Sequence, residues 1–154
     1  MTDNTGKEVF HKRRSRARLA AVQALYQMDI TSAPLNSVIE EFTEHRIGGS
    51  NVDLEFFEDV LNGVIQFQDK LDRDIADHLS EKWSMKRLDM TLRAIMRAGT
   101  YEISRRPDIP ALVIIDEYVS IAADFFEQSE PAFVNGTLDK YAKKIRAAEF
   151  GLVG

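Results

Sequence analysis

The stretch MKRLDMTLRAIMRAGTYEI, residues 85–103, decides the fold class of this chain. Its apolar residues recur at steps of three and four, which is the period of one face of an α-helix. Pro107 and Pro110 follow and would end the helix, because proline donates no backbone hydrogen bond and clashes with the preceding turn. A helix over residues 85–103 is therefore predicted. The members of its apolar stripe are Met85, Leu88, Leu92, Ile95, Met96, Gly99 and Ile103.

Toward the N-terminus, the helical period continues through three further segments. The first begins with Leu19 and ends at the turn-forming cluster 31–34, and the second spans about 35–47 before two glycines. The third runs over about 53–79 and is strongly acidic on its outer face. Asn62-Gly63 inside it predicts a kink or break, because glycine weakens a helix interior by about 1 kcal/mol.

Toward the C-terminus, two more helices are predicted. Residues 112–115 are rich enough in β-branched side chains to imitate a strand, yet the charged residues that follow recur at helical steps. We therefore interpret residues 112–127 as a helix. The last helix follows Ser129-Glu130-Pro131, a sequence typical of helix starts. Every long segment is helical in this interpretation, so the expected fold class is all-α.

The chain length suggests one domain preceded by an arm. Residues 1–12 are expected to form a flexible basic arm, and residues 13–150 a single helical domain. The stretch 79–85 could separate two small bundles within that domain, at about 13–81 and 82–150.

Composition and charge limit the class of protein. With 154 residues, 44% of them hydrophobic, the chain can bury its own core. It has no cysteine, so neither a disulfide nor a thiolate metal site can form, which fits the reducing cytoplasm. No run approaches the roughly 18 apolar residues of a membrane span, so no membrane contact is expected. The net charge of −5 conceals a net charge of +4 over residues 1–20 and of −10 over residues 29–81.

No catalytic, metal or cofactor site is predicted. The histidines His11, His45 and His78 are isolated, and none forms a helical pair of metal ligands. The sequence lacks the glycine-rich loops that cradle nucleotide phosphates. Paired acids such as Glu40-Glu41 lie on polar helix faces, where exposure to water explains them. We therefore expect a protein that is not an enzyme and uses no cofactor.

The basic start of the chain is the most informative feature for function. Wound as a helix at about 100° per residue, the cations from Lys12 to Arg18 point in nearly all directions and do not form one solvated face. Positive charge near a helix start also opposes the helix dipole, by about 0.3–1 kcal/mol for each exposed group. Phosphate would relieve this cost, so the segment predicts nucleic-acid binding. A disordered, solubilising tail is an equally good interpretation of the segment alone.

The last helix favours the nucleic-acid interpretation. Phe133 lies off its apolar stripe and shares a direction with Thr137, Lys140 and Lys144. An aromatic ring beside lysines suits unpaired bases, which stack on such rings for about 1–3 kcal/mol each. If this ring and the basic arm converge, they form one groove for an unpaired strand. The alternative is that Phe133 closes the end of the bundle.

A third group of cations is ambiguous. Arg93 and Arg97 lie one turn apart on the polar side of the 85–103 helix, and Arg105-Arg106 follow. These side chains could bind RNA, meet acidic residues of a partner, or pair with the acidic segment 53–81.

Three strings together resemble one known family. RRSRARLAAVQALY (residues 13–26), IMRAGTYEISRR (95–106) and FVNGTLD (133–139) occur in the order and spacing typical of NusB proteins. Asp108-Ile109-Pro110 and Asp116-Glu117 add scattered matches, so the resemblance covers about residues 9–147.

This resemblance implies two packed small helical bundles with about six to seven helices. It also implies a factor that joins the ribosomal protein NusE and binds single-stranded boxA-type leader RNA within an antitermination complex on RNA polymerase. With the residue patterns above, the candidate RNA-binding residues are Lys12, Arg13, Arg14, Arg16, Arg18, Ser129, Phe133, Asn135 and Lys140. The candidate NusE-binding residues are Tyr26, Leu92, Arg93, Tyr101 and Glu102.

Two departures and two alternatives qualify the resemblance. Leu92 stands where family members commonly carry an acidic residue, and Ser129 and Ala132 stand where polar or basic residues often flank the RNA. A NusB-like module also forms the front of certain ribosomal RNA cytosine methyltransferases, whose catalytic domain and cysteine this chain lacks. A helical adaptor that binds only proteins is the other alternative.

Overall fold

The computed structural model describes residues 2–47, 49, 51–79 and 84–152, with side chains from Gly6 onward. This part of the chain contains helices and no strand, which confirms the predicted all-α class. Its elements are α1 (Thr2–Thr31), α2 (Leu35–Glu41), a π-helical turn η1 (Phe42–Arg46), α3 (Leu54–Ala76), α4 (Met90–Arg105), α5 (Ala111–Phe125), α6 (Ser129–Ile145) and a 3-10 turn η2 (Ala147–Phe150).

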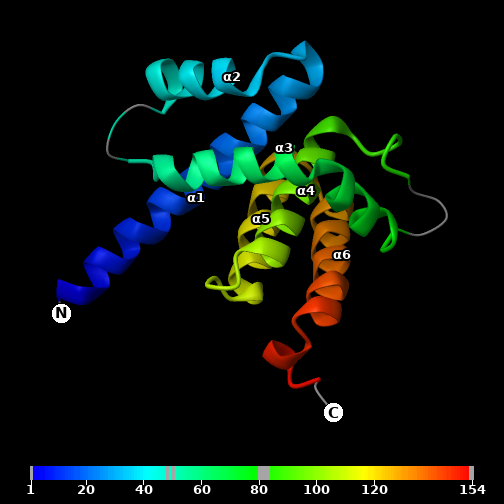
Figure 1. The fold of residues 1–154 in the computed structure, drawn as a ribbon. Helices are drawn as coiled ribbons and strands as arrows, with labels where there is room; N and C mark the ends of the chain where they lie inside the picture. The colour runs from blue at the N-terminus through cyan, green and yellow to red at the C-terminus, as the bar shows by residue number, and fades with distance from the viewer. Residues whose placement is uncertain (1, 48, 50, 80–83, 153–154) are drawn as a thin grey trace.

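Helix α4 is the centre of the packing. It contacts α1 and α3 as well as α5 and α6, so the helices before and after residue 80 share one continuous hydrophobic core. In Figure 1, α2 lies across the far end of α1, and α5 and α6 run side by side below α3. The two predicted sub-bundles are thus joined through α4.

The predicted boundary between an arm and a domain has no counterpart in the structure. Helix α1 runs without interruption from Thr2 to Thr31, and its N-terminal end projects from the body (Figure 1). Residues 2–12 therefore extend the same helix that enters the core at Ala17 and Ala20.

Two local predictions need correction. Helix α4 begins at Met90, not at residue 85, because the Asp89 carboxylate accepts hydrogen bonds from the backbone N–H groups of Thr91 and Leu92 at 2.8 and 3.3 Å and so caps the helix. Helix α3 does not kink at Asn62-Gly63 but at Phe67, whose backbone is non-helical (φ −109°, ψ 16°).

Gly63 has a packing role instead. A Cβ atom there would lie 2.0 Å from the ring of Tyr101, so only glycine allows α3 and α4 to approach this closely.

Among the described residues, no helix is both long and apolar enough to cross a membrane.

Candidate nucleic-acid interface

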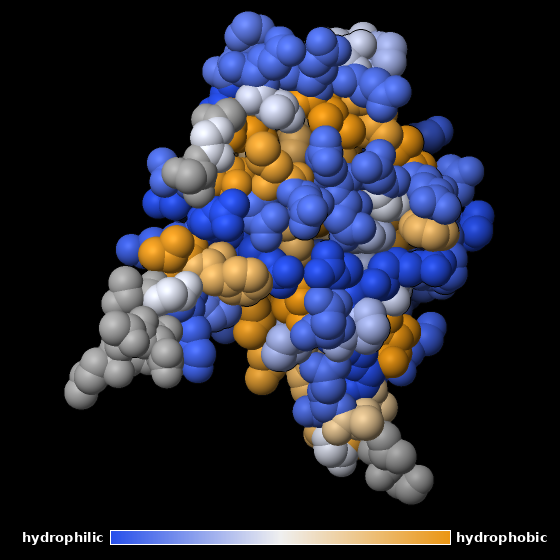
Figure 2. Space-filling view, turned by 60° about the vertical axis from the view of Figure 1, so that its left-hand side comes forward, coloured by the Kyte–Doolittle hydropathy of each residue, from blue (hydrophilic) through white to orange (hydrophobic). Residues whose placement is uncertain are grey.

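The cations of residues 12–16 lie beside the segment 51–53 that leads into α3. Arg13 donates to the Val52 carbonyl at 3.2 Å, and Arg16 donates to the Asn51 carbonyl at 3.1 Å. The backbone N–H of Asp53 in turn donates to the Arg13 carbonyl at 3.2 Å. These contacts fix the basic segment of α1 against the body, while Lys12 and Arg16 remain exposed. Figure 2 shows hydrophilic side chains mixed with apolar ones on this face of the molecule.

A buried ring gathers three guanidinium groups at this place. The Cζ atoms of Arg14, Arg18 and Arg106 lie 4.6, 4.8 and 5.1 Å from the ring centroid of Phe56. A cation over an aromatic ring gains about 0.5–1 kcal/mol at an exposed site and more when water is excluded. Arg14 also lies 3.6 Å from the Asp53 carboxylate. The ring thus holds arginines from α1 and from the end of α4 in one cluster.

Arg18 does not reach the surface, which corrects its assignment to RNA. It is 2% exposed, and its guanidinium donates to both oxygens of Glu102 at 2.8 and 2.9 Å and to Glu117 at 2.8 Å. The Tyr118 hydroxyl also donates to Glu102, and the Ser15 hydroxyl donates to Glu117. The network ties α1 to α4 and α5, so Arg18 has a structural role.

Arg18 and Tyr118 both keep their protons at neutral pH. Burial lowers the pKa of Arg18, but the hydrogen bond and charge of Glu102 outweigh burial and raise it above its ordinary value. Burial and the Glu102 charge raise the pKa of the Tyr118 hydroxyl well above its usual range. Arg18 is therefore a cation and Tyr118 a neutral hydrogen-bond donor.

The predicted residues of α6 differ in accessibility. Ser129, Asn135 and Lys140 are exposed, as an RNA contact requires. Phe133 is partly buried and packs against the core, so only part of its ring is open to solvent. A Cβ atom at Gly136 would meet nothing within 4 Å, so no neighbouring helix requires a glycine at this position of α6.

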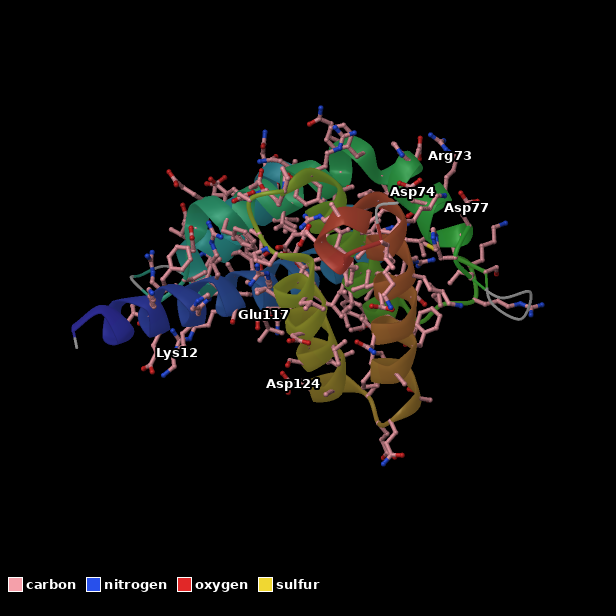
Figure 3. All side chains as sticks on the ribbon, turned by 90° about the horizontal axis from the view of Figure 1, so that it is seen from below. Lys12, Arg73, Asp74, Asp77, Glu117 and Asp124 are labelled. Atoms are coloured by element: carbon pink, nitrogen blue, oxygen red, sulfur yellow. The ribbon has the colours of Figure 1, made fainter. Side chains whose placement is uncertain are left out.

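Helix α5 lies between the two predicted RNA-binding segments. It contacts both α1 and α6, and Figure 3 shows Glu117 and Asp124 on α5 between Lys12 and α6. Carboxylates repel phosphate, so these two acids interrupt a cationic path between the segments. The single continuous groove predicted from the sequence is therefore not formed by adjacent cations, and the α1 segment is the better defined surface.

Most predicted partner residues on α4 are buried, which corrects that part of the interface. Leu92, Tyr101 and Glu102 are at most 5% exposed, because α4 is surrounded by other helices. Tyr101 donates to the Asp59 carboxylate at 3.0 Å, and burial together with this bond raises its pKa to about 12. Arg93 is half-buried and pairs with Asp29 at 3.4 Å.

The ambiguous cations of α4 are also paired internally. Arg97 donates to Asp72 at 2.8 and 2.9 Å and lies 3.4 Å from Asp29. Arg106 pairs with Asp59 at 3.0 Å, and the Arg105 guanidinium lies 3.9 Å from the ring centroid of Phe67. Arg97 and Arg106 thus pair with the acidic segment 53–81, whereas Arg93 pairs with Asp29 of α1 and Arg105 lies over Phe67.

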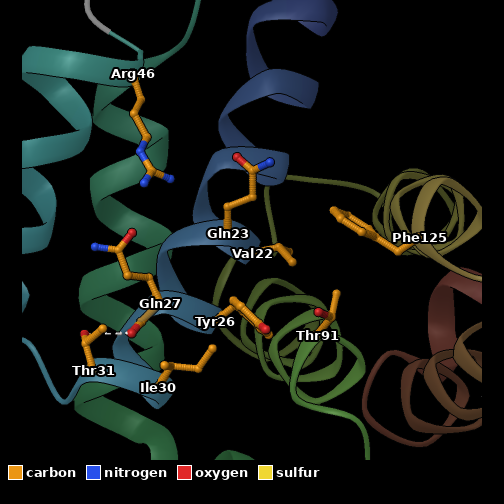
Figure 4. Close-up of a pocket in the computed structure, with 9 residues that line it drawn as sticks. All are labelled: Val22, Gln23, Tyr26, Gln27, Ile30, Thr31, Arg46, Thr91 and Phe125. Atoms are coloured by element: carbon orange, nitrogen blue, oxygen red, sulfur yellow. Dashed lines mark hydrogen bonds between the residues drawn. The ribbon is translucent and has the colours of Figure 1, made fainter.

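Tyr26 lines an open hollow of about 520 Å³ between α1, η1, α4 and α5. The residue is 39% exposed, and Figure 4 shows it beside Ile30, Thr91 and Phe125. Ile30 and Phe125 are 53% and 46% exposed although both are large and apolar. Exposed apolar side chains gathered in one concave place are typical of a protein-binding surface.

Sequence reasoning missed Ile30, Thr91 and Phe125. Of the adjacent pair Phe125-Phe126, only Phe126 fits the apolar stripe of the helix, so the leftover ring was a usable signal. Thr91 gave no signal, because its place in the hollow depends on how α4 crosses α1.

Among the described residues, no cluster of His, Cys, Asp or Glu could hold a metal ion.

Comparisons with known proteins agree on one family. The NusB family model matches residues 15–143. The transcription antitermination protein NusB of Nitrobacter hamburgensis is 47% identical over 145 residues, covering 90% of this chain and 91% of that protein. The protein of the same name from Bradyrhizobium diazoefficiens is 42% identical over 163 residues and covers 98% and 99%.

Solved structures share the fold. The structure of T. maritima NusB has a TM-score of 0.78 and 33% identity, covering 90% of this chain and 97% of that one. A chain from a crystal structure of the antitermination factors NusB and NusE with double-stranded RNA has a TM-score of 0.76 and 21% identity, covering 84% and 96%. At that identity the second likeness concerns the fold alone.

Proposed function

The chain belongs to the NusB family, and on that premise we propose that it is a non-catalytic transcription antitermination factor that binds single-stranded boxA-type leader RNA together with ribosomal protein NusE. We expect it to act in the cytoplasm, as part of the antitermination complex on RNA polymerase.

The basic segment of α1 carries the RNA part of this proposal. Lys12 and Arg16 are exposed cations on an otherwise acidic protein, and Arg13 and Arg14 are held beside them by the segment 51–53. Neutralised phosphates release counterions, so a localised cluster of this kind binds RNA without reading its bases. Specificity then requires further contacts, from α6 or from the partner protein.

The Tyr26 hollow is the proposed site for NusE. It lies on the same helix as the basic segment, and the exposed residue Gln23 lines both this hollow and the neighbouring one that contains Arg16. A protein docked at Tyr26 would therefore be next to RNA bound at Arg16. Binding of the two at adjacent places on α1 explains how a partner could sharpen RNA recognition.

A titration of labelled single-stranded boxA-type RNA at two salt concentrations, with and without NusE, tests the proposal. We expect binding that weakens with salt and strengthens with NusE. Arg16→Ala should weaken binding to every RNA. It should also make the slope of the logarithm of the binding constant against the logarithm of the salt concentration shallower by about 0.7, the value for one phosphate of a single strand. Arg73→Ala is the matched control, because Arg73 is an exposed arginine at the far end of α3 (Figure 3).

Tyr26→Ala tests the partner surface separately. It should abolish the strengthening by NusE while leaving the RNA affinity of the chain alone unchanged. If wild type binds no RNA under either salt condition, the RNA part of the proposal is wrong. If Tyr26→Ala still responds fully to NusE, the partner is docked elsewhere.

A further inference from the structure

Two exposed apolar side chains interrupt the basic segment of α1. Val9 is 53% exposed and Phe10 is 44% exposed, and neither belongs to the core. Residues 7–16 otherwise carry five basic side chains and one acid. Figure 2 shows apolar side chains among hydrophilic ones beside the N-terminal end of α1. Packing in the apolar core therefore does not account for a phenyl ring at this position.

The ring of Phe10 is held in place by the arginine cluster described above. The Arg14 guanidinium lies 4.5 Å from the Phe10 centroid and 4.6 Å from the centroid of buried Phe56. His11 meets the edge of the Phe10 ring, with centroids 5.8 Å apart and planes at 73°. A stack of ring, guanidinium and ring thus runs from the core to the surface and ends in an exposed aromatic side chain.

We propose that Phe10 is a stacking platform for one unpaired nucleobase, which would continue this stack outward. The inference rests on the proposed RNA-binding function and adds a residue that neither the sequence patterns nor the family resemblance indicated. Bases stack on aromatic side chains irrespective of their identity, because each base has a flat π-face. Phe10 would therefore contribute affinity for single-stranded RNA with little selectivity among bases.

The charges around the ring favour a base over an apolar group of a protein. A protein that covered Phe10 would also cover the cations at Lys7, Arg13 and Arg14, and removing these charges from water is costly without a counterion. A nucleotide stacked on the ring brings its own phosphates to the neighbouring cations. Rings bordered by cations are the usual platform for unpaired bases.

The test compares four substitutions at one position in the full chain with NusE present. The probe is a short fluorescein-labelled single-stranded boxA-type RNA, together with a series in which each nucleotide in turn is abasic. Phe10→Ala and Phe10→Leu should both weaken binding at least about fivefold, whereas Phe10→Tyr and Phe10→Trp should bind as wild type does. Val9→Ala is the matched control, because Val9 is an exposed neighbour without an aromatic face, and it should bind normally.

Two further measurements identify stacking as the cause of the weaker binding. The salt dependence of Phe10→Ala should equal that of wild type, because no phosphate contact is lost. One abasic position should weaken wild type but not Phe10→Ala, which locates the stacked base. An unchanged thermal unfolding midpoint shows that the variant is folded.

Three outcomes would overturn the inference. In the first, Phe10→Ala binds normally while Arg16→Ala is weakened, so the RNA function stands without stacking at Phe10. In the second, Phe10→Leu binds as wild type does, so the contact is merely apolar. In the third, Phe10→Ala changes the sedimentation coefficient of the RNA-free protein, so the ring serves a contact between copies. If neither Phe10→Ala nor Arg16→Ala affects binding, the proposed function itself fails.

Discussion

Replacing Arg18 by methionine should destabilise the fold without removing an RNA contact. The substitution keeps most of the side-chain volume but leaves the Glu102 carboxylate, which is 0% exposed, without its cation. Glu117 loses the same partner but can turn to water, because a quarter of its side chain is exposed. The loss should therefore be dominated by Glu102.

The magnitude follows from the three hydrogen bonds of the guanidinium. Each bond to a charged group contributes about 1.5–3 kcal/mol, but folding also removes Arg18 and Glu102 from water, which offsets much of that gain. Removing one partner of such a buried pair costs about 3–5 kcal/mol. We expect a loss of this size in the free energy of unfolding, a large fraction of the roughly 5–15 kcal/mol of a typical domain.

Urea unfolding at pH 7, followed by circular dichroism, measures this loss. The transition midpoint should fall while its slope stays constant, because the surface exposed on unfolding is the same. Arg16→Ala is the matched control and should shift the midpoint far less, because Arg16 is exposed and loses only one hydrogen bond to a backbone carbonyl. The double variant Arg18→Met/Glu102→Gln should be more stable than Arg18→Met, since the neutral amide tolerates burial and can still accept from Tyr118. A midpoint of Arg18→Met equal to that of wild type would refute the internal role of Arg18.

The remaining predictions concern two glycines and two titrating side chains. Gly136→Ala should stabilise the protein by up to about 1 kcal/mol, because a Cβ atom there meets nothing, and should weaken RNA binding if RNA approaches this face of α6. Gly63→Ala should cost about 1–3 kcal/mol or more in a thermal melt, because its Cβ atom would overlap the Tyr101 ring. The hydrogen bond from Arg106 lowers the pKa of Asp108 to about 2, so the stability from this contact is complete above about pH 4 and is lost as the pH falls through 2. In Asp108→Asn the free energy of unfolding should depend less on pH in that window than in wild type. Burial and the bond to Asp59 raise the pKa of Tyr101 to about 12, so the stability from this contact is complete below pH 10 and is lost as the pH rises through 12. The stability difference between Tyr101→Phe and wild type should shrink over that range. The tyrosinate absorbance of Tyr101→Phe should rise less near pH 12 than that of wild type.

The period of apolar residues was sufficient to predict the helices but not their ends. Helical spacing outweighed the β-branched start of α5, which is helical as expected. The start of α4 depended on Asp89 as a cap, and Met85 and Leu88 contribute to the core from outside the helix. A stripe shows which residues face the core, whereas caps decide where the helix begins.

The accessibility of charged residues could not be predicted in the same way. Arg16 and Arg18 are two residues apart in a run of similar side chains, yet one is exposed and the other is buried. The difference arises because Glu102 and Glu117, about 80 to 100 residues away in sequence, converge on Arg18. Glu102 itself was predicted from the family resemblance to contact NusE, not to be buried. A pairing between residues so far apart leaves no local pattern in the sequence.

The burial of Arg18 changes how the basic segment should act. A flexible arm must lose conformational freedom when it binds, at about 0.5–1.5 kcal/mol for each long side chain that becomes ordered. Here Arg18 anchors α1 in the core, and Arg14 lies over the same Phe56 ring that Arg18 contacts. Part of that ordering cost is therefore met during folding, and the cations beside Arg14 are presented to RNA from a fixed helix. A variant that breaks the anchor should weaken RNA binding even in its folded fraction, through lost order and not through lost charge.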